Sequence, residues 1–254
     1  MRQLETPSSE GASKAEQALE LLRTDIVDAR LAPETPLTIE SLKKRYDLGW
    51  TPLREALSRL ESERLVVFSP NRGYRVAGVS RSELLDLQRA RATVECDLLR
   101  DAIRTGDETW EQQLVATHYT LKQTDPLRVN MPEADLARWE KRHDAFHNAL
   151  LEGSSCIWLK RFAAQIRTQL HRHHRNMVFS PALIGGGGAK LLGEEKYTTL
   201  LERASDVAHH SALMEAALAR DENLAIKLLI EHIGLTLSTY EAMPPFSKAQ
   251  SKSD

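Results

Sequence analysis

Hydrophobic residues recur every three or four positions over most of the chain, which is the spacing that places them on one face of an α-helix. In the first third this pattern predicts helices over residues 15–30, 39–46 and 51–60. Two β-prone runs, residues 65–68 and 74–76, follow and are joined by the turn-rich residues 69–73. The short gap between the second and third helices is typical of a helix-turn-helix. Residues 14–78 are therefore predicted to form a winged helix-turn-helix domain.

The third predicted helix has the chemistry of an element that contacts DNA. Thr51 is expected to be its N-cap, and Pro52 stands at the first helical position, where a missing N–H costs nothing. Free N–H groups and arginines at a helix start can bind a phosphate or a base edge. The alternative is an ordinary solvated charged surface. The expected DNA-binding residues on this helix and on the hairpin turn are Thr51, Arg54, Arg59, Arg72 and Gly73.

From residue 80 onward the hydrophobic spacing predicts helices only, so the chain is expected to be mostly α. An all-helical domain is predicted over residues 80–243, with helices at 84–103, 108–123, 132–151, 156–179, 194–219 and 221–243. Residues 182–193 contain four consecutive glycines and are expected to form a mobile loop. A phosphate-binding loop is disfavoured there because no Lys-Ser/Thr follows the glycines in register. The polar ends, residues 1–13 and 244–254, are expected to be disordered.

Composition narrows the class of protein. The net charge of −2 argues against a generally basic surface for nucleic acid, but residues 43–75 hold eight Lys/Arg against four acids. No signal peptide or membrane-spanning apolar run is recognised, so a cytoplasmic protein is expected. In that compartment Cys96 and Cys156 are expected to be reduced thiols without a site role.

All nine histidines of the chain lie beyond residue 117. His143 and His147 are four positions apart and therefore share a helix face, while His210 and His232 lie on the apolar faces of two later helices. These four imidazoles could converge on one point, with hydrogen-bonded core histidines as the alternative. The run from His171 to Arg175 is expected to be a solvated basic helix face, from which one histidine could reach the cavity. His118 and His209 have no partner that the sequence identifies.

The N-terminal domain resembles the DNA-binding domain of the GntR family of bacterial transcription regulators. The resemblance rests on residues 31–33 (Leu-Ala-Pro), residues 51–57 (Thr-Pro-Leu-Arg-Glu-Ala-Leu) and residues 71–76 (Asn-Arg-Gly-Tyr-Arg-Val). One departure is that Gly49-Trp50 replaces the Ser-Arg usually found before the Thr-Pro, so the operator sequence is not implied. The C-terminal half is similar to the FCD ligand-binding domain of the FadR subfamily. The resemblance implies a homodimeric regulator, expected to be a repressor, that binds a palindromic double-stranded operator.

The resemblance also implies a metal site. FCD domains bind a divalent cation through an Asp-x-x-x-His pair and one histidine on each of two later helices. His147, His210 and His232 match the three histidines, and His143 stands where the aspartate usually is. An all-imidazole set favours Zn²⁺, with Ni²⁺ also possible. Asp144 is expected to point about 100° away around the helix and is not counted as a ligand.

The sequence says less about the effector than about the DNA-binding residues and the metal ligands. A cation in an apolar helical cavity suits a small carboxylate. Arg91 matches an arginine that faces the cavity in this family, although a surface pair with Glu95 is equally compatible with the spacing. With Arg91 facing inward, a short dicarboxylate or hydroxy acid is expected. One alternative is a metal-dependent hydrolase that uses the His143/His147 helix with Asp144 as base, and another is a DNA-binding protein without an effector.

Overall fold

The computed structural model describes residues 13–179 and 187–242 of the 254-residue chain. The chain divides into two compact units, Met1–Gly78 and Val79–Asp254, which are described separately here. The predictions of disorder for residues 1–12 and 244–254 lie outside the described residues, but the same prediction is wrong for Ser13, which is the N-cap of α1. Across the part of the chain that is described, no helix is both long enough and apolar enough to cross a membrane.

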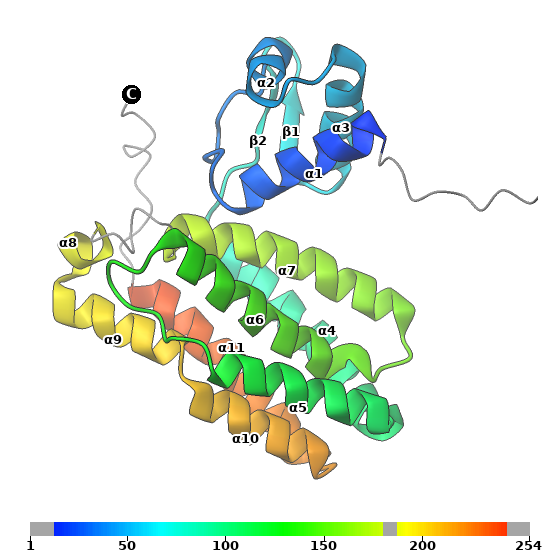
Figure 1. The fold of residues 1–254 in the computed structure, drawn as a ribbon, viewed down its shortest axis with the longest axis vertical. Helices are drawn as coiled ribbons and strands as arrows, with labels where there is room; N and C mark the ends of the chain where they lie inside the picture. The colour runs from blue at the N-terminus through cyan, green and yellow to red at the C-terminus, as the bar shows by residue number, and fades with distance from the viewer. Residues whose placement is uncertain (1–12, 180–186, 243–254) are drawn as a thin grey trace, which may run out of the picture. The chain divides into compact units, whose positions relative to one another are not determined.

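The first unit is a winged helix-turn-helix, as the sequence predicted (Figure 1). Its elements are α1 (Lys14–Val27), α2 (Ile39–Tyr46), α3 (Trp50–Ser62), β1 (Val66–Ser69) and β2 (Gly73–Val76). The two strands pair antiparallel, with Val66 opposite Val76 and Ser69 opposite Gly73. Helix α1 ends at Val27, earlier than predicted, because Ala29 takes a left-handed conformation with φ of 60°.

Side chains at helical spacing form the core of the winged unit. Leu53, Ala56, Leu57 and Leu60 on α3 are fully buried against α1, as predicted. Burial of each leucine contributes about 1.5–3 kcal/mol, so α3 is stabilised mainly by its packing against α1 and less by its N-terminal cap. The predicted cap is wrong, because α3 has Gly49 as its N-cap with no side-chain bond, and Thr51 lies within the first turn.

A polar contact fastens α1 to α2. The Asp25 carboxylate accepts hydrogen bonds from Arg45 and from the Tyr46 hydroxyl, each at 2.7 Å. Burial alone would raise the pKa of Asp25, but these two donors outweigh it and hold the pKa below its usual value. Asp25 therefore adds a charged contact between α1 and α2 to the apolar core of the winged unit.

The second unit is all-helical within the described residues. It contains α4 (Arg81–Thr105), α5 (Glu108–Lys122), α6 (Glu133–Glu152), α7 (Ile157–Met177), α8 (Gly188–Leu192), α9 (Glu194–Ala204), α10 (Val207–Leu218) and α11 (Glu222–Ala242). Helix α4 contacts α6, α7 and α11, while α5 packs on α6 and α10 (Figure 1). This arrangement brings α4, α6, α7, α10 and α11 around one interior.

Two predictions for this unit are wrong. The single helix expected over residues 194–219 is two helices, because the Ser205 side chain bonds back to the Leu201 carbonyl and Asp206 caps α10 by accepting from the Ala208 N–H. Part of the expected glycine-rich loop is helix α8, and residues 180–186 lie outside the described residues. Gly188 fits there because a Cβ would come within 2.3 Å of the Tyr197 ring.

Candidate functional site

Four histidines from three helices meet inside the helical unit. His143 and His147 come from α6, His210 from α10 and His232 from α11. One potential ligand atom from each lies within 4.8 Å of the others. The Nε2 atoms of His143 and His147 are 3.2 Å apart. The structure thus brings together the four histidines that the sequence singled out.

Neighbouring groups fix the orientation of these rings. His210 Nδ1 is 2.8 Å from the backbone carbonyl of Asp206, the N-cap residue of α10. Since the carbonyl can only accept, Nδ1 carries the proton and the Nε2 lone pair is left for another partner. The His143 ring stacks on Trp139, with centroids 4.7 Å apart, and His232 stacks on His209. The backbone of the first turn of α10 therefore orients the His210 ring.

Three of the four histidines, His147, His210 and His232, are held in the neutral form. Burial lowers the pKa of His210 to about 3 and lowers the pKa values of His147 and His232 well below the usual value. Neutral imidazole is the form that binds a metal ion. Among the described residues, His147 Nδ1 and His210 Nε2 are buried without a hydrogen-bond partner.

These observations test whether the residues suit a divalent cation. Nitrogen ligands lie about 2.0–2.1 Å from Zn²⁺, so two ligands are at most about 4.2 Å apart. The four donor atoms, within 4.8 Å of one another, need only small side-chain adjustments to reach that spacing. The four imidazoles therefore fit a borderline cation by donor type and position.

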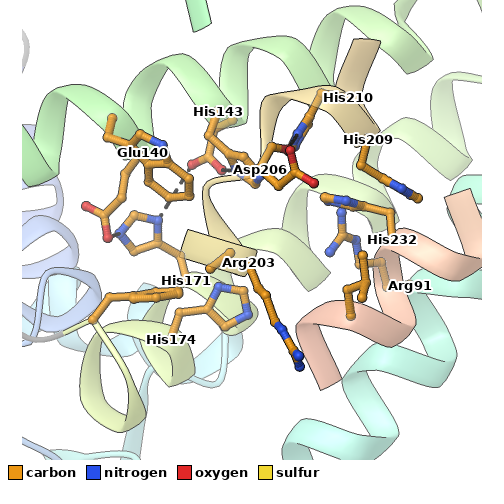
Figure 2. A pocket seen from close by; sticks show the side chains of 15 residues that line it. Arg91, Glu140, His143, His171, His174, Arg203, Asp206, His209, His210 and His232 are labelled. Atoms are coloured by element: carbon orange, nitrogen blue, oxygen red, sulfur yellow. Dashed lines mark hydrogen bonds and ion pairs between the residues drawn. The ribbon is translucent and has the colours of Figure 1, made fainter. Parts of the chain in front are cut away.

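A cavity adjoins the histidine cluster (Figure 2). It has a volume of about 60 Å³, and His143, His210 and His232 form part of its wall. Arg91 from α4 and Arg203 from α9 line the same cavity, and Trp139, Phe179 and Leu235 supply apolar surface. The cavity is therefore small and combines imidazoles, guanidinium groups and apolar walls.

Arg91 takes part in both arrangements that the sequence left open, the pair with Glu95 and the wall of the cavity. Its Nε donates to Glu95 at 2.9 Å, but the pair is buried rather than on the surface, and Arg91 also lines the cavity. Glu95 lies 3.6 Å from Arg167 as well. Within the described residues, Glu95 is the only group that accepts a hydrogen bond from Arg91, so its two terminal nitrogens remain available to a ligand.

The prediction of a solvated face from His171 to Arg175 is wrong. Arg172 and His173 are fully buried, and Arg175 is nearly so. His173 Nε2 lies 3.1 Å from Glu83 on α4, and Arg175 donates to Glu140 on α6. These acids, far away in the sequence, allow the basic run to be buried between helices. His171 and His174 line the cavity.

Further residues near the site were missed or left without partners by the sequence analysis. Asp144 lines the cavity, 3.8 Å from His143 Nδ1 and 3.6 Å from His171 Nδ1. Burial alone would raise the pKa of Asp144, but interaction with these two histidines lowers it. His209 Nε2 lies 3.0 Å from the Leu228 carbonyl, and His118 Nε2 lies 2.9 Å from Ser211 Oγ. The sequence did not identify Arg203 as a cavity residue, because α9 comes next to the cavity only in the folded chain.

The predicted DNA-binding residues all belong to the winged unit. Thr51, Arg54 and Arg59 are exposed on α3, and Arg72 is exposed in the turn between the strands. Gly73 begins β2 with φ of +70°, a conformation that a side chain would strain. The exposed side of α3 and the hairpin turn thus present three arginines outside the packed core.

Comparisons with known proteins bear on both units. Residues 14–76 match the bacterial regulatory proteins of the gntR family, and residues 86–235 match the FCD domain. The chain is 32% identical to the HTH-type transcriptional regulator BphR of Paraburkholderia xenovorans (strain LB400), over 91% of this chain and 87% of that protein. It is 33% identical to the HTH-type transcriptional repressor GlaR of Escherichia coli (strain K12), over 84% of this chain and 89% of that protein.

A solved structure shares the fold. E. coli McbR/YncC superposes with a TM-score of 0.68 at 19% identity, covering 91% of this chain and 99% of that one. This chain therefore shares its fold with that protein.

Proposed function

We propose that DNA binding by this chain is controlled by a small carboxylate held beside a metal ion. The chain belongs to the gntR family of bacterial regulatory proteins and carries an FCD domain. The chain is a transcription regulator and not an enzyme. The observation that carries the proposal is that His143, His210, His232 and Arg91 all line one cavity. The expected FadR-subfamily placement is part of this proposal.

The DNA-binding part of the proposal rests on the winged unit. Arg54 and Arg59 on α3, with Arg72 in the hairpin turn, are exposed cations on elements that dock on DNA in helix-turn-helix proteins. A homodimer would read a palindromic operator, because the two-fold symmetry of the protein imposes the same symmetry on its site. Repression is proposed because the E. coli relative GlaR is named a repressor. The complex would form in the cytoplasm.

The metal part of the proposal rests on the four histidines. His143, His147, His210 and His232 would hold one divalent ion, Zn²⁺ or alternatively Ni²⁺. When bound, the ion would supply a positive centre that accepts an oxygen ligand. The protein's own contribution is to keep four imidazoles in position and to leave one side of the cluster open to the cavity.

The effector part of the proposal follows from charge and size. An anion placed between the histidine cluster and Arg91 would receive hydrogen bonds from the terminal guanidinium nitrogens. The apolar walls and the small cavity suit a short carbon chain. A short dicarboxylate or hydroxy acid satisfies both ends, whereas a long acyl chain does not fit.

The alternatives have less support. Asp144, which would replace the base of a metal-dependent hydrolase, lies beside His143 and His171, and the relatives are named as regulators. A DNA-binding protein without an effector would leave the buried Arg91 and three histidines of the cluster, His143, His210 and His232, around an idle cavity.

Calorimetry against C3–C6 mono- and dicarboxylates tests the proposal. The titrations would use wild-type protein, Arg91→Ala and chelator-treated protein. Binding of at least one acid to the wild type is expected, weakened by loss of either Arg91 or the metal. The same acid should change affinity for a duplex selected by the protein from random DNA, since only differential binding to two states can shift an equilibrium. Tight binding that survives both losses would refute the proposed pocket.

A further inference from the structure

An exposed tryptophan opens helix α3. Trp50 is the first residue of the helix, and 53% of its surface is accessible. The fold does not require it, because the core of the winged unit is formed by other positions of α3. Its ring carries the Arg54 guanidinium above it, with Cζ 4.6 Å from the ring centroid.

The stack follows from helix geometry. Residues four apart lie one above the other on the same flank, so the Arg54 side chain can fold back over the indole of Trp50. In a stack of this kind one face of the guanidinium lies against the ring, while the N–H groups, which lie in its plane, can still donate outward. Among the described residues, no carbonyl or carboxylate accepts a hydrogen bond from Arg54. The fork is therefore held in place while its donors stay unused.

Arg59 provides a contrast on the same helix. It is also exposed, but it lies about 140° around the helix from Arg54 and has no described aromatic partner. The two arginines thus differ in how far the protein limits their motion before DNA binds.

We propose that Trp50 is a positioning residue that sets the operator specificity of this chain by orienting Arg54. A planar fork fixed by stacking is suited to donate two hydrogen bonds to the O6 and N7 acceptors of guanine. The inference rests on the proposed DNA-binding function. It assigns the sequence preference to a pair of residues instead of to Arg54 alone.

The test starts from DNA duplexes that the full-length wild-type chain selects from a random-sequence pool. Anisotropy titrations at fixed salt then compare the selected duplex with duplexes changed at one base pair of a half-site. The variants are Trp50→Ala, Trp50→Phe, Arg54→Ala and the double variant, with Arg59→Ala as the matched arginine control. Circular dichroism and melting temperature check that each variant folds.

Trp50→Ala should weaken binding to the selected duplex roughly two- to five-fold, in keeping with an exposed cation–π contact. It should reduce discrimination at the same base pair as Arg54→Ala and add little when Arg54 is already absent. Trp50→Phe should restore much of the discrimination because a ring remains, and Arg59→Ala should act at other positions.

Other results would overturn the inference. Additive losses from Trp50→Ala and Arg54→Ala would show that the two residues act independently. Unchanged base preference in Trp50→Ala, with or without a loss of affinity, would remove the positioning role. Failure of the wild type to select any duplex over random DNA would instead contradict the proposed function itself, so the two failures are distinguishable.

Discussion

Metal addition should stabilise the helical unit through the four-histidine cluster. The perturbation is His210→Ala, which removes a buried imidazole whose Nε2 has no hydrogen-bond partner among the described residues. The matched control is His118→Ala. His118 is also buried, but its Nε2 bonds to Ser211 and it lies outside the cluster. Both variants lose a core histidine, and only one loses a proposed ligand.

The expected size of the effect follows from linkage. A ligand at 100 times its Kd stabilises the state that binds it by about 2.7 kcal/mol. For a unit of this size each kcal/mol raises Tm by about 2–4 °C, so the wild type should shift by roughly 5–11 °C. Even loss of a residue that only supports a ligand weakens a metal site by about 10–100-fold. A 100-fold loss would leave about 0.4 kcal/mol, or about 1 °C, at the same metal concentration.

Differential scanning calorimetry of chelator-treated protein, with and without added Zn²⁺ or Ni²⁺, measures this shift. His118→Ala should lower the starting Tm but keep the metal-induced shift, whereas His210→Ala should lose most of it. Elemental analysis of protein purified without chelator gives an independent reading. The reasoning fails if the wild type neither contains nor takes up metal, or if both variants shift as much as the wild type; the cluster would then be a set of core histidines.

Three further predictions concern charge. Chelator-treated protein should lose stability as pH falls below about 6.5, because His147, His210 and His232 bind protons in the unfolded chain but not in the folded one, where burial lowers their pKa values. Each of these histidines contributes up to about 1.4 kcal/mol per pH unit. Calorimetry at pH 7 and 5.5 can check this loss. Asp25→Asn should destabilise the winged unit by about 1–3 kcal/mol in urea unfolding, because it removes the charge that holds Arg45, and an unchanged midpoint would contradict this. Glu95→Gln should weaken binding of an identified acid roughly tenfold by loosening Arg91, and unaltered affinity in calorimetry would show that Glu95 does not position it.

Much of the fold could be predicted because it depends on local spacing. The inner face of α3 and the strand pair follow from the periodicity of apolar residues, and the structure confirms both. The break at Ser205 and Asp206 was not predictable in the same way, since apolar spacing continues on both sides of it. A back-bonded serine and a capping aspartate interrupt the helix, and these are weak signals next to apolar periodicity.

Some residues of the candidate site could be predicted from the sequence in the same way, and others could not. His143 and His147 were predictable as neighbours because four residues of helix place them together. The burial of His173 was not, because its partner Glu83 lies ninety residues earlier in the chain and meets it only through packing of α4 on α7. Long-range charge pairing therefore decides whether a basic run is a surface or an interior, and a single sequence does not reveal that pairing.

The charges in the proposed site would also make binding of the metal and binding of the acid depend on each other. Four neutral imidazoles would leave the charge of a divalent ion uncompensated, and the Arg91 charge is already balanced in part by Glu95. His143 adds to this imbalance, because it supplies a nitrogen donor where the resemblance to FCD domains leads us to expect a carboxylate. An anion entering the cavity would therefore meet more net positive charge than in a site with an aspartate, and its binding should tighten the hold on the metal. Linkage requires the reciprocal effect by the same factor, so the metal should tighten the hold on the acid.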